Sequence, residues 1–321
     1  MTGPGDRSVR QRSGADDRAG PGRPLPEESM RQAGDVMSHG TSRALQPRLD
    51  LTDAHARALI SLIYDHSGIV LTNDKKSLIA SRLQKRLKAL RLRSFRDYLH
   101  YLQESPERDA EIVAMIDEIT TNKTEFFRER QHFDYLVSDL LPGLATSDWT
   151  ILNFWCAGCS TGEEPYSLAM VLAEYFGTTR NFSIHATDLC TQALWTASQA
   201  VYPNDLGKLI PPGLMQKYTM KGRGSQSGRF RIIPELRQRV SFTYTNLIAN
   251  DWDIPGAMHV IFCRNVMIYF DLKTRSKVVA GFRRYLKAGG HLFIGHSETL
   301  GGIDRALGFT QIKPTVYVLQ K

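Results

Sequence analysis

The stretch "FWCAGCSTGEEPYSLA", residues 154–169, can be interpreted in two ways. Its Cys156–Cys159 segment has the C-x-x-C spacing of a redox dithiol or of half a zinc site. Its Gly158 and Gly162 instead suit the turn that joins a strand to a helix in an open α/β sheet. The sequence has no second Cys or His pair at ligand spacing and no sign of the later cis-proline strand of a thioredoxin unit. The glycine interpretation is therefore favoured, and the two cysteines are expected to be small packing residues.

The residues after the glycines indicate which cofactor this turn would accept. The turn opens onto Glu163 and Glu164, which would repel a pyrophosphate, so NAD, FAD and ATP are disfavoured. Asp188 ends the next predicted strand, where an acid can bind a ribose diol. A nucleoside with a positive charge and no phosphate is S-adenosylmethionine. The alternative is that both glutamates merely complement the helix dipole.

The hydrophobic pattern changes character at about Trp149. Before it, apolar residues recur at helical spacing without a strand candidate, and helices are expected over residues 53–68, 73–93, 94–105 and 107–120. After it, strands are expected at 150–155, 181–188, 257–265 and 291–295, alternating with helices at 163–177, 191–202 and 272–290. This alternation predicts an α/β fold with a parallel sheet and right-handed crossovers.

Two further β segments are expected outside this alternation. The polar, glycine-containing stretch between about Asp205 and Tyr244 predicts a small antiparallel insertion, with turn chemistry at Gly222, Gly224 and Gly228. The last segment, "TVYVLQK" at 315–321, is expected to form an edge strand of the main sheet.

Composition restricts the class of protein. Residues 1–48 contain no Phe, Trp or Tyr, and 12 of the 48 are Gly or Pro, which predicts a disordered tail. The chain has four cysteines, no apolar run of the roughly 18 residues that span a bilayer, and no apolar core of a secretory signal near its start. A cytoplasmic protein is expected, without membrane insertion. The net charge of +8 suggests an acidic partner.

Six strings, in this order, carry a family resemblance. They are "TTNKTEFFRE" (120–129), "WCAGCSTGEEPYSLA" (155–169), "ATDL" (186–189), "TNL" (245–247), "FCRNVMIYFD" (262–271) and "GGHLFIGHSETL" (289–300). Together they closely resemble the chemotaxis receptor methyltransferases, the CheR-type protein-glutamate O-methyltransferases, over residues from about 50 to 321.

The resemblance implies a Rossmann-like α/β sheet of the S-adenosylmethionine-dependent methyltransferase kind. An N-terminal all-helical domain and a small antiparallel β insertion would accompany it. The implied divisions are a disordered tail at 1–48, a helical substrate-docking domain at 49–130, and a catalytic domain at 131–321 with the insertion at about 208–241.

The resemblance also implies the site residues. The family's contacts to S-adenosylmethionine, whose product is S-adenosylhomocysteine, fall on Asn122, Thr124, Arg128, Glu163, Asp188, Asn246, Leu247, Arg264 and Asn265. Tyr269 and Arg128 are the expected catalytic residues, and no metal is expected.

The implied reaction, methyl transfer to a glutamate side chain, needs no general base, because a carboxyl group with a pKa of about 4.3 is already ionised at neutral pH. Arg128 or Arg264 is expected to orient the carboxylate or the cofactor. Tyr269 is expected beside the transferred methyl, although a core aromatic at a strand end is an equal alternative. His296, in "GHSE", is expected to cap or pack a turn.

Partner predictions rest on charge and on the resemblance. Lys75 to Arg96 contains nine Lys or Arg and no acid, and Lys75, Arg82, Arg86 and Arg93 have the spacing of one helix face. This basic helix is expected to dock the acidic helical domain of methyl-accepting chemotaxis receptors, although a solvated charged face is the simpler alternative. The loop Gly222–Gly228 resembles the one that some members use to hold a receptor's C-terminal peptide. A monomer is expected.

Two other functions remain open. A nucleic-acid methyltransferase would also explain the basic helix, but Asn265 to Tyr269 lacks the prolines that base-amino methylation usually shows after the fourth strand, and no nucleic acid is expected as a partner. A non-catalytic module that senses the cofactor and binds partners is the third possibility.

Overall fold

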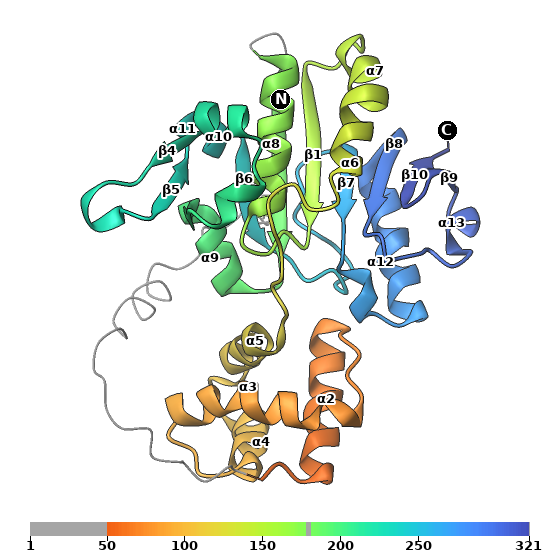
Figure 1. Cartoon of the computed structure of the whole chain (residues 1–321). Helices are drawn as coiled ribbons and strands as arrows, with labels where there is room; N and C mark the ends of the chain where they lie inside the picture. The colour runs from red at the N-terminus through yellow and green to blue at the C-terminus, as the bar shows by residue number, and fades with distance from the viewer. Residues whose placement is uncertain (1–49, 178–180, 321) are drawn as a thin grey trace, which may run out of the picture. The chain divides into compact units, whose positions relative to one another are not determined.

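The structure is a computed structural model that describes residues 50–177 and 181–320. The predicted disordered tail at 1–48 lies outside the described residues. Figure 1 shows a helical domain followed along the chain by an α/β domain. None of the helices within the described residues is long and apolar enough to cross a bilayer.

The helical domain forms where the apolar spacing predicts it. Thr52 caps the first helix by accepting the N–H of His55 at 3.2 Å, and Gly68 ends that helix with a φ of 71°. Buried apolar side chains of all four helices form one core. The elements are α2 (Asp53–Ser67), the 3₁₀ turn η1 (Asn73–Lys75), α3 (Lys76–Ala89), α4 (Phe95–Glu104) and α5 (Arg108–Ile119).

A buried glutamate joins three helices of this domain. Glu111 on α5 is 4% exposed. It accepts Nε of Arg86 at 3.0 Å and the hydroxyl of Tyr98 at 2.7 Å. A second bond from Arg86 to the other carboxylate oxygen makes the ion pair bidentate. Arg86 is therefore turned toward α5 rather than presented to solvent.

The α/β domain contains a seven-stranded sheet, ordered β6-β2-β1-β7-β8-β10-β9. The first five strands of this order pair in parallel, and β10 and β9 are antiparallel. The bounds are β1 (Ile151–Ala157), β2 (Asn181–Asp188), β6 (Val240–Tyr244), β7 (Met258–Cys263), β8 (Leu286–Ile294), β9 (Phe309–Lys313) and β10 (Val316–Leu319).

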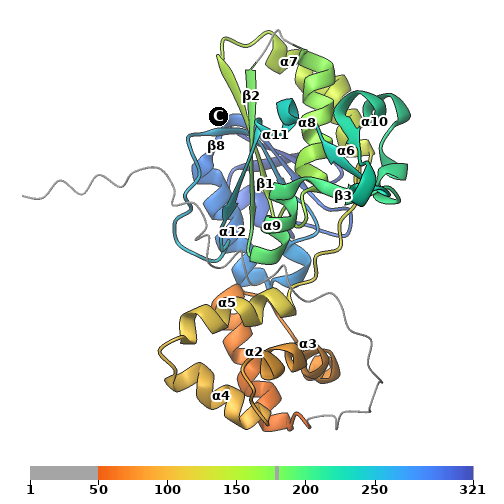
Figure 2. The ribbon, with the colours of Figure 1, turned by 90° about the vertical axis from the view of Figure 1, so that its left-hand side faces the viewer.

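Helices cover both faces of this sheet (Figure 2). Along β1 the side chains alternate, with Phe154 and Cys156 in one core and Trp155 and Ala157 in the other. The first core includes α8 (Glu163–Phe176) and the chain before β1, which forms α6 (Gln131–Tyr135), the π-helix η2 (Leu136–Leu140) and α7 (Leu141–Ala145). The second core includes α12 (Leu272–Tyr285).

The insertion is a separate three-stranded antiparallel sheet, ordered β3-β5-β4. Its strands are β3 (Val201–Pro203), β4 (Thr219–Lys221) and β5 (Arg229–Ile232). The short elements around them are α9 (Thr191–Gln199), η3 (Leu206–Leu209), α10 (Pro212–Tyr218), η4 (Gly224–Gln226) and α11 (Pro234–Arg237). The predicted span is wrong at both ends. Strand β3, which pairs with β5, lies before it in a stretch predicted as helix, and β6 pairs in parallel with β2 in the main sheet. As a partly exposed outer strand, β6 has the alternation of an antiparallel hairpin.

The end of the chain also differs from the prediction. The segment expected at the edge, β10, lies between β8 and β9, and β9 forms the edge. Three of the four residues of β10 are buried, whereas four of the five residues of β9 are exposed. A short, mostly buried apolar run is typical of an internal strand. The last helix, α13 (Ile303–Ala306), precedes β9, and the 3₁₀ turn η5 (Met267–Tyr269) follows β7.

Replacing Glu111 by alanine is expected to lower the free energy of unfolding by about 3 kcal/mol, because Arg86 and the Tyr98 hydroxyl lose their shared buried partner. Urea unfolding followed by circular dichroism measures this change. Lys85→Ala, which removes an ion pair with Glu118 from an exposed lysine, is the control and is expected to cost less than about 1 kcal/mol. Equal effects of the two changes would contradict the assignment.

Candidate active site

A cavity of about 310 Å³ lies at the carboxyl ends of β1, β2 and β7, where open α/β sheets bind ligands. Part of its wall comes from the helical domain, including Ile69, Val70 and Leu78. Nine of the ten residues predicted for the site line it, namely Asn122, Thr124, Arg128, Asp188, Asn246, Leu247, Arg264, Asn265 and Tyr269.

The remaining predicted residue, Glu163, lies off the wall. Its buried carboxylate accepts the hydroxyl of Thr161 at 2.6 Å. Glu164 lines the cavity instead. Successive helical residues point about 100° apart, so Glu164 can face the cavity while Glu163 points away from it. The sequence offers no signal that selects one of the two.

The glycine turn after β1 is closely built. Gly158 has a φ of 87°, Gly162 has a φ of 97°, and Ser160 between them also has a positive φ of 50°. A Cβ added at Gly158 would lie 2.3 Å from a methyl carbon of Val266. The loop after β7 therefore approaches the first turn so closely that only glycine fits at this position.

Asp188 is held in place by the same turn. Its carboxylate oxygens accept the backbone N–H groups of Ser160 at 2.7 Å and of Cys190 at 2.8 Å. Burial raises the pKa of Asp188, while these bonds act in the opposite direction. Its position at the end of β2 is the one predicted for an acid that binds a ribose diol.

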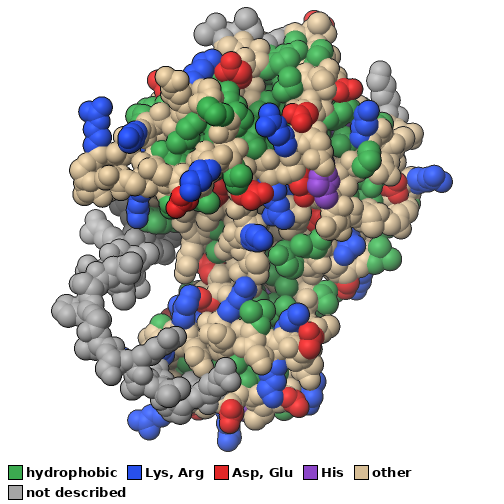
Figure 3. All heavy atoms as spheres, viewed as in Figure 1, with side chains coloured by type: hydrophobic (Ala, Val, Ile, Leu, Met, Phe, Trp, Pro, Cys, Tyr) green, Lys and Arg blue, Asp and Glu red, His purple; other side chains and the backbone are tan. Residues whose placement is uncertain are grey.

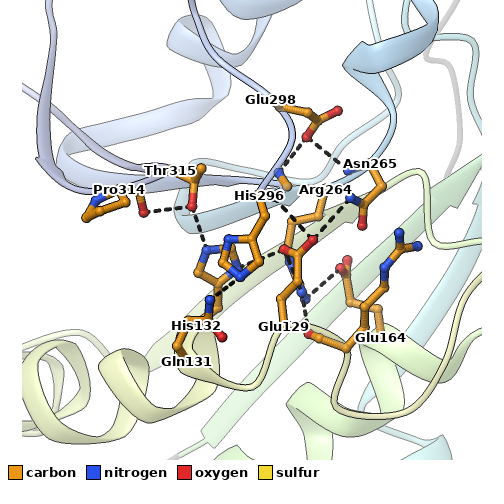
Figure 4. A network of polar contacts seen from close by, with 12 residues as sticks. Glu129, Gln131, His132, Glu164, Arg264, Asn265, His296, Glu298, Pro314 and Thr315 are labelled. Atoms are coloured by element: carbon orange, nitrogen blue, oxygen red, sulfur yellow. Dashed lines mark hydrogen bonds and ion pairs between the residues drawn. The ribbon is translucent and has the colours of Figure 1, made fainter.

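Arg264 is the most enclosed charge of the site, at 5% exposed (Figure 4). Its guanidinium lies 3.1 Å from a carboxylate oxygen of Glu129 and 3.2 Å from one of Glu164. A further bond goes to the backbone carbonyl of Arg128. Burial raises the pKa of Glu164, and the nearby Arg264 charge opposes that effect. The guanidinium is therefore committed to groups of the protein itself.

Arg128 is held less completely than Arg264. It is half-buried, lines the cavity, and donates from Nη1 to the carbonyl of Lys123 at 2.9 Å. No carboxylate within the described part of the chain forms an ion pair with it. Of the two arginines predicted to orient a carboxylate, Arg128 is thus the one that has N–H donors available for a ligand.

The helical domain is bonded directly to the cavity wall. The Asn246 side chain donates to the carbonyl of His66 at 2.7 Å and accepts the N–H of Ile248 at 3.1 Å. The N–H of Val70 donates to the carbonyl of Tyr269 at 2.8 Å. The Asn246 side-chain amide is thereby engaged in structure, and so is its backbone carbonyl, which accepts the N–H of Ala249 at 3.0 Å and the indole N–H of Trp252 at 3.2 Å.

A carboxylate and two histidines gather behind Arg264, which the sequence did not indicate. Glu129, His132 and His296 each place a potential ligand atom within 4.8 Å of the others. His132 lies 3.5 Å from Glu129 and, through its other ring nitrogen, 2.8 Å from the hydroxyl of Thr315. A divalent cation here would be repelled by the Arg264 guanidinium, which already shares Glu129. His296 contacts the side chain of Gln131, in keeping with a packing role.

The cysteines of the opening stretch are free and buried. Burial raises the pKa of both Cys156 and Cys159, so neither thiol is poised as a thiolate. Both belong to the core that includes α8. The structure thus supports the packing interpretation over the redox one.

Comparison with known families decides the identity of the chain. Residues 122–317 match "CheR methyltransferase, SAM binding domain", and residues 54–120 match "CheR methyltransferase, all-alpha domain". The chain belongs to the CheR methyltransferase family. It is accordingly an S-adenosylmethionine-dependent methyltransferase, as the six strings predicted.

Curated relatives of this CheR methyltransferase cover most of its length. The "Chemotaxis protein methyltransferase" of Escherichia coli (strain K12) is 41% identical over 88% of this chain and 96% of the relative. That of Borreliella burgdorferi is 39% identical over 79% of this chain and 91% of the relative. "Chemotaxis protein methyltransferase 2" of Pseudomonas aeruginosa is 39% identical over 78% and 90%, respectively.

The residues present fit S-adenosylmethionine. The wall includes the carboxylates of Glu164 and Asp188, and the glycine turn contains no lysine that would favour a phosphate. Apolar wall residues suited to a flat base are Leu189, Leu247 and Val266. The wall also carries cations, namely Lys75, Arg82, Lys123, Arg128 and Arg264. Mixed charge of this kind suits a nucleoside that bears both cationic groups and a carboxylate, as S-adenosylmethionine does.

The stability of the protein is expected to fall below pH 6.5 because of His132. Burial, followed by the Arg264 charge, lowers the pKa of this 2% exposed side chain from 6.5 to about 3. As pH falls below about 6.5, His132 becomes protonated in the unfolded chain but stays neutral in the folded protein. The free energy of unfolding therefore declines between about pH 6.5 and pH 3. His132 alone is expected to cost about 1.4 kcal/mol between pH 7.5 and 5.5.

Urea unfolding at these two pH values tests this in the His132→Gln variant, whose loss of stability is expected to be smaller by about 1.4 kcal/mol. The exposed His100, changed to Gln, is the control. An unchanged pH dependence in His132→Gln would contradict the assignment.

Proposed function

We propose that this CheR methyltransferase methylates glutamate side chains of methyl-accepting chemotaxis receptors. It would transfer the methyl group of S-adenosylmethionine, with glutamyl methyl esters and S-adenosylhomocysteine as products, in adaptation of cytoplasmic chemosensory signalling. The observation that carries the proposal is the half-buried Arg128 on the wall of a methyltransferase cavity, with donors available for an anionic substrate. The curated relatives named chemotaxis protein methyltransferases support the receptor as substrate.

The wall is suited to a substrate that is already ionised. A glutamate carboxyl, with a pKa of about 4.3, has lost its proton at neutral pH. Among the described residues no histidine lines the cavity. Its carboxylates are Glu125, Glu164 and Asp188, of which Glu164 is held by Arg264 and Asp188 by backbone N–H groups. The chain therefore has to orient the carboxylate and exclude water rather than remove a proton.

The cofactor would be held by the predicted residues that line the cavity. S-adenosylmethionine, when bound, supplies an electrophilic methyl group on a sulfonium sulfur. Asp188 would bind the ribose diol, and the apolar side chain of Leu247 would contact the base. Asn122, Thr124, Arg128, Asn246, Arg264 and Asn265 complete the proposed contacts, whereas Glu163 would act only through the Thr161 hydroxyl.

Arg128 is the proposed orienting residue for the substrate carboxylate, because Arg264 is saturated by Glu129 and Glu164. Tyr269 lines the same cavity, and its phenol forms no hydrogen bond that the structure records within the described residues. We assign the Tyr269 hydroxyl to the space beside the transferred methyl. A Tyr269→Phe enzyme with unchanged turnover would remove that hydroxyl from the mechanism.

The basic surface proposed to dock the receptor differs from the predicted stripe. Helix α3 ends at Ala89, so Lys75 and Arg93 flank it rather than continue its face. Arg82 donates to the carbonyls of Ile119 and Thr120, and Arg86 pairs with Glu111. The exposed cations that remain are Lys75, Lys85, Lys88, Arg91, Arg93 and Arg96. On the face drawn in Figure 3, basic side chains are interspersed with acidic ones, which favours a specific acidic partner over a nucleic-acid backbone.

A second receptor contact is proposed at the insertion. Strand β4 is an edge of the three-stranded sheet, and an edge strand can accept an added peptide strand. The loop from Gly222 to Gly228 joins it to β5. We propose that a receptor's C-terminal peptide is held there by a monomeric enzyme.

The proposed function is tested by transfer of labelled methyl from S-adenosylmethionine to receptor-containing membranes. Label that is released as methanol by mild alkali is expected, because a glutamyl methyl ester hydrolyses under these conditions. Label that resists alkali would indicate nitrogen methylation and would overturn the carboxylate assignment. Binding of S-adenosylhomocysteine without any transfer would favour the non-catalytic module, and label in added nucleic acid would favour a nucleic-acid methyltransferase.

Arg128→Gln is expected to lower kcat/KM for receptor methylation roughly 10- to 100-fold, since a hydrogen bond to a charged group contributes about 1.5–3 kcal/mol. Arg130→Gln, two residues away and exposed, removes the same charge outside the cavity wall and is the matched control. Steady-state kinetics on receptor membranes provide the measurement. If the two variants agree within about twofold, Arg128 does not orient the carboxylate.

A further inference from the structure

Glu298 lies next to the site without lining it. It follows β8, is 7% exposed, and is absent from the cavity wall. Its carboxylate accepts the N–H of Asn265 at 2.9 Å and that of Ile268 at 3.1 Å. A third bond comes from the N–H of Gly295. One buried side chain thus satisfies three backbone donors from two loops that lie about 30 residues apart in sequence.

The turn that Glu298 holds has an unusual backbone conformation and borders the cavity. Asn265 has a φ of 61°, in the left-handed region that few residues other than glycine, asparagine and aspartate adopt. Four residues later Tyr269 ends the 3₁₀ turn η5, and both residues line the cavity. The side chain of Asn265 is fixed separately, through Glu129 at 3.1 Å. The backbone of the turn therefore depends on Glu298, while the Asn265 amide depends on Glu129.

The contact between the two loops leaves no room for a side chain at Gly295. A Cβ added at Gly295 would lie 2.4 Å from the Asn265 side-chain nitrogen and 2.9 Å from a Glu298 oxygen. Glycine at 295 thus permits the two loops to approach closely enough for Glu298 to bridge them. Loss of the carboxylate would leave buried N–H groups without an acceptor.

We propose that Glu298 is a positioning residue of the methyl transfer, which sets the Asn265–Tyr269 turn and thereby the placement of the Tyr269 phenol. It acts through hydrogen bonds accepted from the backbone, and not as a base, because its carboxylate does not reach the cavity. The role in catalysis rests on the proposed function, whereas the control of the turn does not.

Glu298→Gln tests the proposal with almost no change in side-chain size. One acceptor oxygen becomes an NH₂ group that faces a backbone N–H donor, so at least one of the three bonds is lost. The kcat for receptor methylation at saturating cofactor is expected to fall roughly 10- to 100-fold, because small displacements of reacting groups have effects of this size. Gly295→Ala is expected to show the same fall in kcat, because its Cβ pushes Asn265 away.

Val279→Ala is the control for stability. Val279 is fully buried in α12 and is not part of the cavity wall, so its loss weakens the fold without touching the turn. The thermal midpoints of the variants are compared with their kcat values. A Glu298→Gln enzyme whose kcat equals that of Val279→Ala, at an equal loss of midpoint, would overturn the proposal.

Calorimetry with S-adenosylhomocysteine separates this inference from the proposed function. Asn265 lines the cavity, so Glu298→Gln is expected to weaken binding by roughly fivefold or more relative to Val279→Ala. If the wild-type protein bound this compound but transferred no methyl to receptors, the proposed function would fail while the binding comparison still tested the turn. Equal affinities of the two variants would show that Glu298 does not position Asn265.

Discussion

The Arg264 guanidinium, buried between Glu129 and Glu164, ties together three parts of the chain that are distant in sequence. An ion removed from water destabilises a fold by several kcal/mol unless its partners surround it. The segment before α6, the start of α8 and the loop after β7 are therefore linked through this one side chain. The cavity lies where they meet.

Around this cation the acidic groups act mainly as acceptors of structural hydrogen bonds. Glu129 binds Arg264 and Asn265, Asp188 binds two backbone N–H groups, and Glu298 binds three. None of these groups is arranged to shuttle a proton. Such a site agrees with a reaction in which the nucleophile arrives already ionised and correct alignment is the main requirement.

The sequence predicted the type and order of most elements, because helical spacing and short apolar runs leave few alternatives. It was wrong where an outer strand is half exposed, as in β6, and where a short buried run could be an edge or an interior strand, as in β10. It placed Arg82 and Arg86 on a docking face, whereas tertiary partners turn both inward. The direction in which a helical side chain points depends on partners elsewhere in the chain, such as Glu111. The spacing of apolar residues along a helix does not reveal these partners.

For the site, too, the sequence predicted only part of what the structure contains. The six strings that resemble the family predicted nine residues of the cavity wall, because these residues lie within short motifs. Glu298 and Glu129 occur within the same strings, but their importance arises from backbone donors and a buried guanidinium contributed by other segments. Only the folded arrangement shows which acid meets which donor.

The bonds from Val70 to Tyr269 and from Asn246 to His66 have a mechanical consequence. Because the Val70 N–H of the helical domain donates to the carbonyl of Tyr269, a displacement of that domain would shift the turn that carries the phenol ring. Capture of the substrate and adjustment of the reaction centre would then be a single movement. For the same reason, a helical domain taken from a homologous enzyme would have to place a backbone carbonyl and a backbone N–H where His66 and Val70 have them.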